Sequence, residues 1–331
     1  MPAESPAEPA AVETPASVHR LEFDVPWPPR RVAAYLLDGP QPILVDAGPP
    51  GDDAEAALEE QLAAVGLALD DIEHVVLTHP HVDHVGLVPA LRGAGAEIHA
   101  AGEELDQLRR DEAALEASAR EVGRGAGLTG EELSEAVERA VESLRRNRGL
   151  VAPDETTPIA GSGPVDVGDR RFEAIHAPGH QCYHTCLETT VDGRRLLFSG
   201  DALIESFRPG LLHVGLDRGA YEAVDAFRDG LDRLGESDAG LALPGHGPVF
   251  ADVSGVVEWT RNELDRLVAE TRAGVDAVGP ATPLAITTER VGHQRHPIQL
   301  LDTLGALGTL ESDGAVEKSM EDGVRYYRRS S

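Results

Sequence analysis

The sequence predicts an α/β protein, and two observations support that fold class. Within the first hundred residues, short β-favouring apolar runs alternate with stretches whose apolar residues recur at helical spacing, the layer pattern of α/β domains. Several apolar runs also end in motifs that combine glycine with histidine or aspartate. With 331 residues, 41% hydrophobic and 4% aromatic, we expect an aliphatic core in one large domain with an appendage, or in two domains.

The first seventeen residues are rich in Pro, Ala and Glu, and we expect them to form a disordered tail. They have neither the basic start nor the apolar centre of a secretory signal. The longest apolar runs are far shorter than the roughly 20 residues that a membrane span needs. The two cysteines, Cys182 and Cys186, cannot form a disulfide framework and suit a reducing compartment. A cytoplasmic protein without membrane attachment is therefore expected.

The main domain is predicted to open with an antiparallel meander of three short strands separated by Pro-rich turns, at 18–23, 31–37 and 43–45. The third strand ends at Asp46. Apolar residues spaced on one face then predict a helix at 53–65. The next expected elements are a strand at 72–77, a helix at 87–91 and a strand at 97–100.

Residues 103–150 interrupt this alternation with about two charged, Ala-rich helices, split by the glycine-rich segment 123–130. Their thin apolar stripes fit a hairpin packed on the body, or an insertion that covers the site and determines selectivity. Arg145, Arg146 and Arg148 lie close together and could meet an anion, although a charge run is more often a solvated face.

After the insertion, the prediction resumes with further elements: strands at 171–175, 184–191, 196–198 and 241–243, and a helix at 220–234. We place the end of the main domain, which starts at residue 18, at residue 254. Residues 255–331 are predicted to form a small C-terminal domain that resembles a winged helix, with helices at 256–272, 283–290 and 298–310 and a hairpin at 315–319 and 324–327. Because the hairpin turn is acidic, we favour packing or homodimer formation over duplex binding for this domain.

The net charge of -29 is strongly acidic, and of the 29 basic residues only Lys318 is lysine. This composition resembles proteins adapted to high salt, where screening shortens the reach of surface repulsion. A GC-rich genome would give a similar composition. Either origin disfavours a general nucleic-acid binder, although a localised basic groove is still compatible with the sequence.

A dense group of metal-ligand side chains follows the predicted strand at 72–77. His79 and His81 are two residues apart on an extended segment, so they point the same way and can reach one ion. A turn after Val82 would aim Asp83 and His84 at a second position. Imidazole and carboxylate are donors that a zinc-like ion accepts. The alternative is a chance cluster on a solvated loop.

Three further polar residues lie in glycine-containing motifs at predicted strand ends. His180 follows Ala-Pro-Gly, Asp201 follows Ser-Gly, and His246 lies within Pro-Gly-His-Gly-Pro. Each motif alone is weak, because Gly-His-Gly and Ser-Gly-Asp are common in turns. Together with the cluster at 79–84, in this order and spacing, they favour a metal centre.

With these motifs the chain resembles the metallo-β-lactamase superfamily, whose His-x-His-x-Asp-His signature matches residues 79–84. The resemblance covers roughly residues 18–254 and implies a four-layer αββα sandwich with two metals at the sheet edges. The implied ligands are His79, His81 and His180 for one ion, Asp83, His84 and His246 for the other, and Asp201 as the bridge.

The resemblance also assigns two supporting residues. Asp46 matches a superfamily position that lies behind the ligands and supports them. His184 matches a frequently seen second histidine, and the alternative for it is a half-buried strand residue. Gln181-Cys182-Tyr183 departs from the Thr/Ser-x-Gly that often follows the equivalent of His180, which puts a specific hydroxyacylglutathione activity in doubt.

Seven ligands for two ions leave open positions, which favours catalysis over a closed structural site. Two zinc ions, with iron or manganese as alternatives, would convert a bridging water to hydroxide for attack on a carbonyl carbon or a phosphorus. Asp83 would be placed to accept or relay a proton.

The predicted activity is hydrolysis of a small ester or thioester, similar to glyoxalase II or the lactonases. Three alternatives stay open: a β-lactamase-like endoribonuclease, an iron-dependent sulfur dioxygenase, and a winged-helix regulator without enzymatic activity. Cys182 and Cys186 flank the site, and a buried thiol is favoured over a redox role for them.

Overall fold

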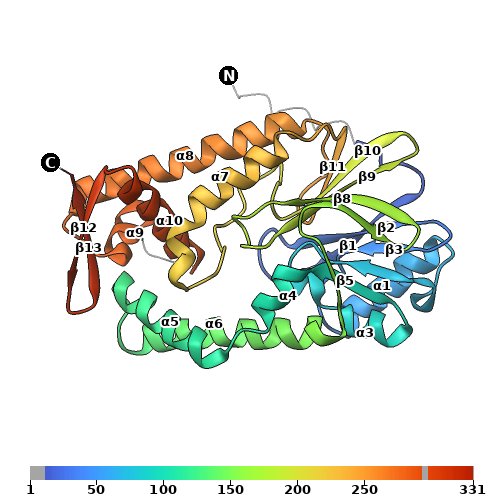
Figure 1. Cartoon of the computed structure of the whole chain (residues 1–331), viewed down its shortest axis with the longest axis horizontal. Coiled ribbons are helices and arrows are strands. Elements are labelled where there is room, and N and C mark those ends of the chain that lie inside the picture. The colour runs from blue at the N-terminus through green and yellow to red at the C-terminus, as the bar shows by residue number, and fades with distance from the viewer. Residues whose placement is uncertain (1–11, 293–296, 331) are drawn as a thin grey trace, which may run out of the picture.

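The computed structural model describes residues 12–292 and 297–330. Two β-sheets pack face to face, and helices cover both outer faces, so the predicted αββα sandwich is confirmed (Figure 1). Most of the expected tail, residues 1–11, lies outside the described part of the chain. From Val12 onward the chain contacts the sandwich, because Val12 packs on the core between the sheets and Arg194 donates a 2.8 Å hydrogen bond to the Glu13 carbonyl.

The first sheet has six strands in chain order. The first three form the predicted antiparallel meander, and the pairs from the third strand onward are parallel. Along Arg31–Leu37, alternate side chains enter the core between the sheets and the core under the outer helices, which explains why nearly all of this strand is buried. The strands are β1 (Val18–Asp24), β2 (Arg31–Leu37), β3 (Ile43–Val45), β4 (His74–Val76), β5 (Glu97–Ala101) and β6 (Thr157–Ile159).

The second sheet has five strands in the order β11-β10-β9-β8-β7. Its strands are β7 (Gly163–Val167), β8 (Arg170–His176), β9 (Thr185–Val191), β10 (Arg194–Gly200) and β11 (Leu241–Pro244). Strands β6 and β7 were not predicted from the sequence. Both contain a proline, Pro158 and Pro164, and both lie at the edge of their sheet, where a strand tolerates proline.

Helices α1 (Asp52–Ala64) and α3 (Val88–Ala94) pack on the outer face of the first sheet. Helices α7 (Ala223–Leu234) and α8 (Val253–Val278) pack on the outer face of the second. The other short elements are helix α2 (Val82–Val85) and the 3-10 turns at Leu69–Asp71, Pro153–Glu155 and Arg218–Glu222.

The insertion contains three helices where about two were predicted: α4 (Gly102–Leu108), α5 (Glu112–Ala126) and α6 (Gly130–Val151). The additional break follows Leu108. There the side chain of Asp111 accepts a 2.8 Å hydrogen bond from the Ala114 N–H and so starts α5. No glycine or proline marks this break, so the sequence pattern concealed it.

The C-terminal part contains α9 (Pro283–Val291), α10 (Ile298–Ser312), β12 (Val316–Glu321) and β13 (Val324–Arg329), in the predicted order. Helix α10 packs on α8 and α9, and its leucines also join a core with α5 and α6 of the insertion (Figure 1). The C-terminal part therefore packs within the chain. The domain boundary at residue 254, the winged-helix likeness and homodimer formation stay predictions.

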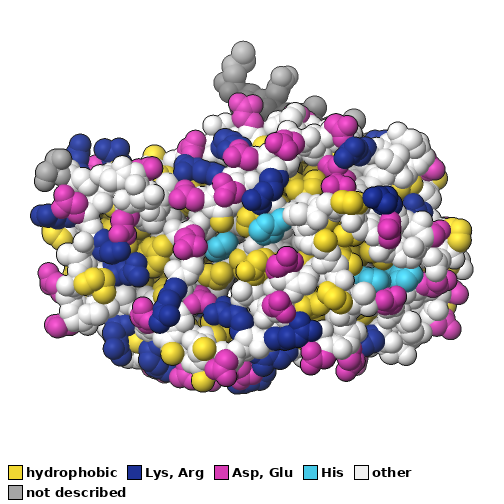
Figure 2. Space-filling model, viewed as in Figure 1, with side chains coloured by type: hydrophobic (Ala, Val, Ile, Leu, Met, Phe, Trp, Pro, Cys, Tyr) yellow, Lys and Arg dark blue, Asp and Glu magenta, His cyan; other side chains and the backbone are white. Residues whose placement is uncertain are grey.

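Acidic and basic side chains are interspersed on the face shown in Figure 2. Basic side chains gather along its lower edge, over α5 and α6, but several are paired with acids. Arg120 bonds Glu116 at 2.8 Å, and Arg145 bonds Glu112 at 2.7 Å. None of the helices in the described part of the chain combines the length and apolar character that crossing a membrane requires.

Candidate metal centre

The predicted site residues lie at one edge of the sandwich, where β3, β4, β8, β10 and β11 end. Hydrogen bonds between backbone groups fix the loops there: the Thr185 N–H donates to the Thr78 carbonyl at 2.9 Å, and the Gly245 N–H to the Gly200 carbonyl at 2.8 Å. The turn after β3 uses left-handed backbone at Asp46, with φ 62°. The fold thus converts scattered motifs into one cluster.

One group of donors consists of His79, His81, His180 and Asp201. His81 Nδ1 lies 3.0 Å from Nε2 of both His79 and His180. Asp201 Oδ2 lies 3.4 Å from His180 Nε2 and 4.0 Å from His79 Nε2. Tetrahedral zinc with bonds of 2.0–2.2 Å places neighbouring ligand atoms about 3.3 Å apart. These spacings fit one such ion.

The second group consists of Asp83, His84 and His246, and Asp201 adjoins it. Asp83 Oδ2 and Asp201 Oδ2 each lie 3.4 Å from His246 Nε2. Asp201 Oδ1 lies 3.5 Å from His84 Nε2, and both atoms are buried without a hydrogen-bond partner among the described residues. An ion between them would satisfy these two acceptors. The structure therefore brings all seven predicted ligands together, while their ligand roles stay a prediction.

Burial keeps the imidazoles of the first group neutral. It lowers the pKa of His79 and of His180, and with the neighbouring His180 it lowers the pKa of His81 to about 3. Burial alone would raise the pKa of Asp201, but His246 and His84 outweigh it and hold that pKa well below its usual range. Neutral imidazoles and an ionised carboxylate are the forms that bind a metal.

In the second group the pKa values of both histidines are raised, so that positive charge is favoured there. Burial alone would lower the pKa of His246, but Asp201 and Asp83 outweigh it and raise it to about 10. Burial likewise opposes protonation of His84, and the carboxylates of Asp201 and Asp46 raise its pKa. Protons on these rings, or cations in their place, balance the buried carboxylates.

Asp46 lies behind the donors, as the resemblance implied. It accepts a 2.9 Å hydrogen bond from the Thr78 N–H, and its Oδ2 lies 2.9 Å from His84 Nδ1. A proton on that Nδ1 leaves Nε2 free to face Asp201. Backbone carbonyls likewise favour a proton on Nδ1 of two other histidines. His180 Nδ1 lies 3.0 Å from the Gly210 oxygen, and His246 Nδ1 lies 2.6 Å from the Arg31 oxygen.

His184 lies behind the centre and outside both donor groups. Its Nε2 accepts a 3.1 Å hydrogen bond from the backbone N–H of Asp201, and its ring stacks on His79 with centroids 4.8 Å apart. His184 therefore holds the Asp201 backbone. Burial raises the pKa of both thiols, that of Cys182 to about 12, as expected for unreactive cysteines.

Gln181 is a site residue that the sequence analysis did not assign. The nitrogen of its side-chain amide lies 2.5 Å from His81 Nε2. A metal on Nδ1 of His81 would leave the proton on Nε2, and a half-turn of the Gln181 amide group would then place its oxygen, in place of the nitrogen, where it accepts that proton. Its position directly after His180 was the available signal.

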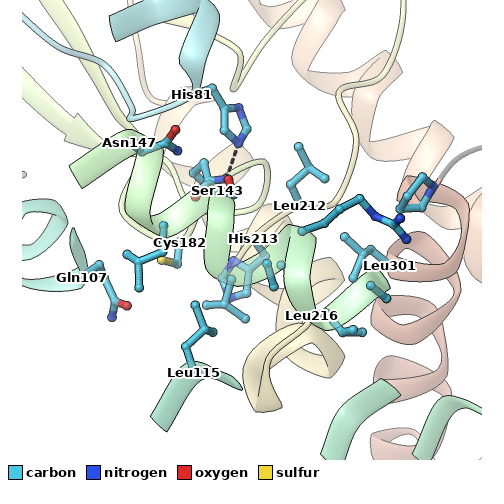
Figure 3. A pocket seen from close by; sticks show the side chains of 18 of the residues that line it. His81, Gln107, Leu115, Ser143, Asn147, Cys182, Leu212, His213, Leu216 and Leu301 are labelled. Carbon is cyan, nitrogen blue, oxygen red and sulfur yellow. Dashed lines mark hydrogen bonds between the residues drawn. The ribbon is translucent and has the colours of Figure 1, made fainter. Parts of the chain in front are cut away.

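A cavity of about 350 Å³ opens beside His81 (Figure 3). The cavity is walled by the insertion, the loop at 211–216 and the start of α10. The insertion therefore borders the site, which agrees with the interpretation that it covers the site, while its part in selectivity stays a prediction. The polar and charged lining side chains are His81, Gln107, Arg110, Glu132, Arg139, Ser143, Asn147, Gln181 and His213. Most of the wall is aliphatic, including Leu115, Leu128, Leu144, Leu212, Leu216 and Leu301.

The three arginines near the end of α6 make internal contacts. Arg145 and Arg148 pair with Glu112 at 2.7 and 2.9 Å, and Arg148 also donates to the Leu108 carbonyl at 2.6 Å. Arg146 contacts the Asn147 side chain at 3.2 Å. The suggestion that this run meets an anion is therefore not supported, and Arg148 instead ties α6 to the end of α4.

Comparison with known proteins agrees with this geometry. A family model described as "Metallo-beta-lactamase superfamily" matches residues 27–246. The probable metallo-hydrolase YqjP of Bacillus subtilis (strain 168) is 26% identical over 323 residues, 95% of this chain and 98% of that protein.

Two solved structures are similar over nearly their full length. The metallo-beta-lactamase family protein TTHA1429 of Thermus thermophilus has a TM-score of 0.79 and 28% identity, covering 95% of this chain and 98% of that one. A beta-lactamase domain protein from Burkholderia ambifaria has a TM-score of 0.73 and 21% identity, covering 96% and 94%, which supports the fold alone. The insertion and the C-terminal part thus lie within the matched region.

Proposed function

This chain belongs to the metallo-beta-lactamase superfamily and is a metallo-hydrolase, and we propose that it cleaves a small ester or thioester at a dinuclear centre. The observation that supports two ions is the position of Asp201. One of its carboxylate oxygens lies 3.4 Å from both His180 and His246, which belong to different donor groups.

In this proposal each donor group holds one ion and Asp201 belongs to both. The donors are imidazoles and carboxylates without a thiolate, a set that suits zinc and also admits iron or manganese. When bound, such ions lower the pKa of water and polarise a carbonyl oxygen. The ligands are His79, His81 and His180 for the first ion and Asp83, His84 and His246 for the second.

Asp83 is the proposed acid–base residue. Burial alone would raise its pKa, but the contact with His246 and the nearby His84 outweigh burial and lower the pKa to about 2. The carboxylate is therefore ionised at neutral pH, which is the form that binds a metal, and with so low a pKa it would pass a proton on and not retain it. Asp46 and Gln181 orient the imidazoles of His84 and His81, so the donors are held in place before substrate binds.

The cavity beside His81 supports a small substrate. Its volume of about 350 Å³ and its leucine-rich wall suit a molecule with an apolar acyl or leaving group. The wall would also exclude water around the scissile bond. A strand of RNA would need a long basic groove instead.

A substrate panel tests this proposal. Protein loaded with zinc or manganese is assayed on acyl-thioesters, lactones and simple esters of increasing acyl length, beside a labelled RNA. We expect turnover of at least one ester class, with RNA left intact. RNA cleavage that disappears in the Asp201→Ala variant, without any ester turnover, would replace this proposal with the ribonuclease.

Elemental analysis of the same preparation identifies the metal. Zinc supports hydrolysis, whereas iron together with oxygen-dependent oxidation of a thiol substrate would identify a sulfur dioxygenase.

A further inference from the structure

A second cluster of donors lies at the opposite end of strand β4 from the metal centre. His74 begins this strand, whereas the motif at 79–84 follows its end. In the parallel pairing of β4 with β5, His74 lies opposite Glu97 and Val76 lies opposite His99. Side chains at matched positions share a face, and so do residues two apart, so all three donors project from the same side of the sheet.

The donor atoms of this cluster converge. His74 Nδ1 lies 3.2 Å from His99 Nε2, and Glu97 Oε2 lies 3.7 Å and 3.9 Å from these two nitrogens. The spacing expected around a tetrahedral zinc ion is about 3.3 Å. A closure of a few tenths of an ångström by the Glu97 side chain, which is 50% exposed, would complete three ligand positions.

The surroundings leave these donors available. Both rings are buried, and within residues 12–292 and 297–330 the other two ring nitrogens, His74 Nε2 and His99 Nδ1, have no hydrogen-bond partner that would fix either ring. Glu97 uses its other oxygen, Oε1, to accept a 2.7 Å hydrogen bond from Thr157, which leaves Oε2 facing the imidazoles. Two facing nitrogens can share only one proton, whereas a cation uses both lone pairs and the carboxylate.

The second sheet closes over this cluster. A Cβ on Gly168, in the turn between β7 and β8, would lie 2.6 Å from Cδ2 of His74, so the glycine allows the turn to approach the ring. The Glu97 side chain is 50% exposed, so this ligand is in contact with solvent, which could supply an ion and a water molecule.

We propose that His74, Glu97 and His99 form a separate site for a divalent transition-metal ion, with Zn²⁺ as the best match and water as the fourth ligand. The site joins the beginnings of β4 and β5, away from the reaction centre. Its role is to stabilise the sheet on which the motif at 79–84 rests, and it does not depend on the proposed hydrolysis.

Zinc counting tests the proposal. Full-length protein stripped with EDTA is dialysed against micromolar Zn²⁺, and bound zinc is measured by mass spectrometry. We expect the wild type to bind one zinc per chain more than His99→Gln or Glu97→Gln. His19→Gln serves as the matched control, because His19 lies on the edge strand β1 outside every donor cluster, and it should bind as the wild type does.

A second measurement keeps the test independent of folding in the variants. Zinc-edge anomalous diffraction from wild-type crystals should give a peak between His74 Nδ1, His99 Nε2 and Glu97 Oε2. The proposal would be overturned if wild type and a folded His99→Gln bound equal amounts of zinc, or if that peak were absent. His74 and His99 would then be only a hydrogen-bonded pair. We expect ester turnover by His99→Gln to stay within about twofold of wild type, so a failed substrate panel and a failed zinc count are distinguishable.

Discussion

Gly245 occupies a position where the metal centre leaves no room for a side chain. A Cβ there would lie 2.4 Å from Cε1 of His84 and 2.6 Å from Oδ1 of Asp201. The backbone cannot move away easily, because the Gly245 carbonyl accepts a 2.8 Å hydrogen bond from the Ala33 N–H and its own N–H is bonded to Gly200. This glycine therefore allows the two donor groups to approach each other.

We expect Gly245→Ala to lower kcat/KM by about a hundredfold, since a displacement of about 1 Å at a reaction centre has an effect of that size. Zinc affinity should fall in parallel. Gly240→Ala is the matched control, because a Cβ at that position meets nothing closer than the Arg195 carbonyl at 3.9 Å. Wild-type kinetics and zinc content in Gly245→Ala would contradict the crowding argument.

Asp201 gives a sharper test of the two-ion arrangement. Asp201→Ala removes the carboxylate that lies 3.4 Å from a histidine of each donor group, so we expect turnover to be abolished while circular dichroism shows a folded chain. The control is Asp238→Ala, which removes a carboxylate whose side chain is 77% exposed. Near-normal rates in Asp201→Ala would refute the bridging role.

The parts of the metal centre that could be predicted are those whose residues lie close together in the sequence. The donors at 79–84 are adjacent in sequence, so their chemistry and period-two spacing were enough to indicate a site. The carbonyls of Gly210 and Arg31, which orient His180 and His246, carry no sequence signal because any residue supplies a carbonyl. Gln181 was visible as an unusual neighbour of His180, but its contact with His81 depends on how two loops meet.

Among the secondary-structure elements, strands and helices with a strong periodic pattern were predicted close to their observed bounds. The failures have physical causes: β6 and β7 contain proline at a sheet edge, and the break between α4 and α5 depends on the Asp111 cap. The insertion packs on α10, which lies about 170 residues further along the chain. The spacing of apolar residues within one element does not predict which distant element it contacts.

Asp217 fastens the insertion to the loop that forms one wall of the cavity. Its carboxylate accepts hydrogen bonds from Arg110 at 2.5 Å, from the Ser118 hydroxyl and from the Arg218 N–H at 2.7 Å. Burial alone would raise the pKa of Asp217, but the bonds from Ser118 and Arg110 outweigh it and lower the pKa. A carboxyl whose pKa is lower in the folded chain contributes stability above its unfolded pKa of about 3.9 and loses it as pH falls through the folded value.

We therefore expect Asp217→Asn to lower the free energy of unfolding by about 1–3 kcal/mol at pH 7. The difference from wild type should shrink below pH 4, where the wild-type carboxyl also becomes protonated. Urea unfolding at the two pH values measures this. Asp232→Asn is the control, because its ion pair with Arg261 lies at the surface and should contribute no more than about 1 kcal/mol. A difference for Asp217→Asn that is constant with pH would show that packing, not charge, explains its effect.

The insertion and the C-terminal helices are parts of one assembly around the cavity. Leucines of α10 and apolar residues of α5 and α6 share a core, and all three helices contribute to the cavity wall. The similar T. thermophilus structure is matched along 98% of its length, so both the insertion and the C-terminal helices lie within the matched fold. Truncation at the predicted boundary would remove a wall of the cavity.

The acidic composition makes a prediction about the chain in solution. With 58 acidic and 29 basic residues, repulsion between like charges should destabilise the compact state at low salt. The Debye length falls from about 30 Å at 0.01 M salt to about 3 Å at 1 M, so NaCl should relieve most of that repulsion. A gain of about 2 kcal/mol would raise Tm by roughly 3 °C in a chain of this size.

Thermal unfolding in 0.01 M and 1 M NaCl at pH 7.5 measures this effect, and the same two NaCl concentrations at pH 5 provide the control. Because the sequence pI is about 4.7, the chain carries much less net charge at pH 5 than at pH 7.5, and the gain from salt should be smaller there. An equal gain at both pH values would point to a general salting effect on apolar burial. A Tm that does not change with salt at pH 7.5 would mean that the acidic residues reflect codon composition and not adaptation to high salt.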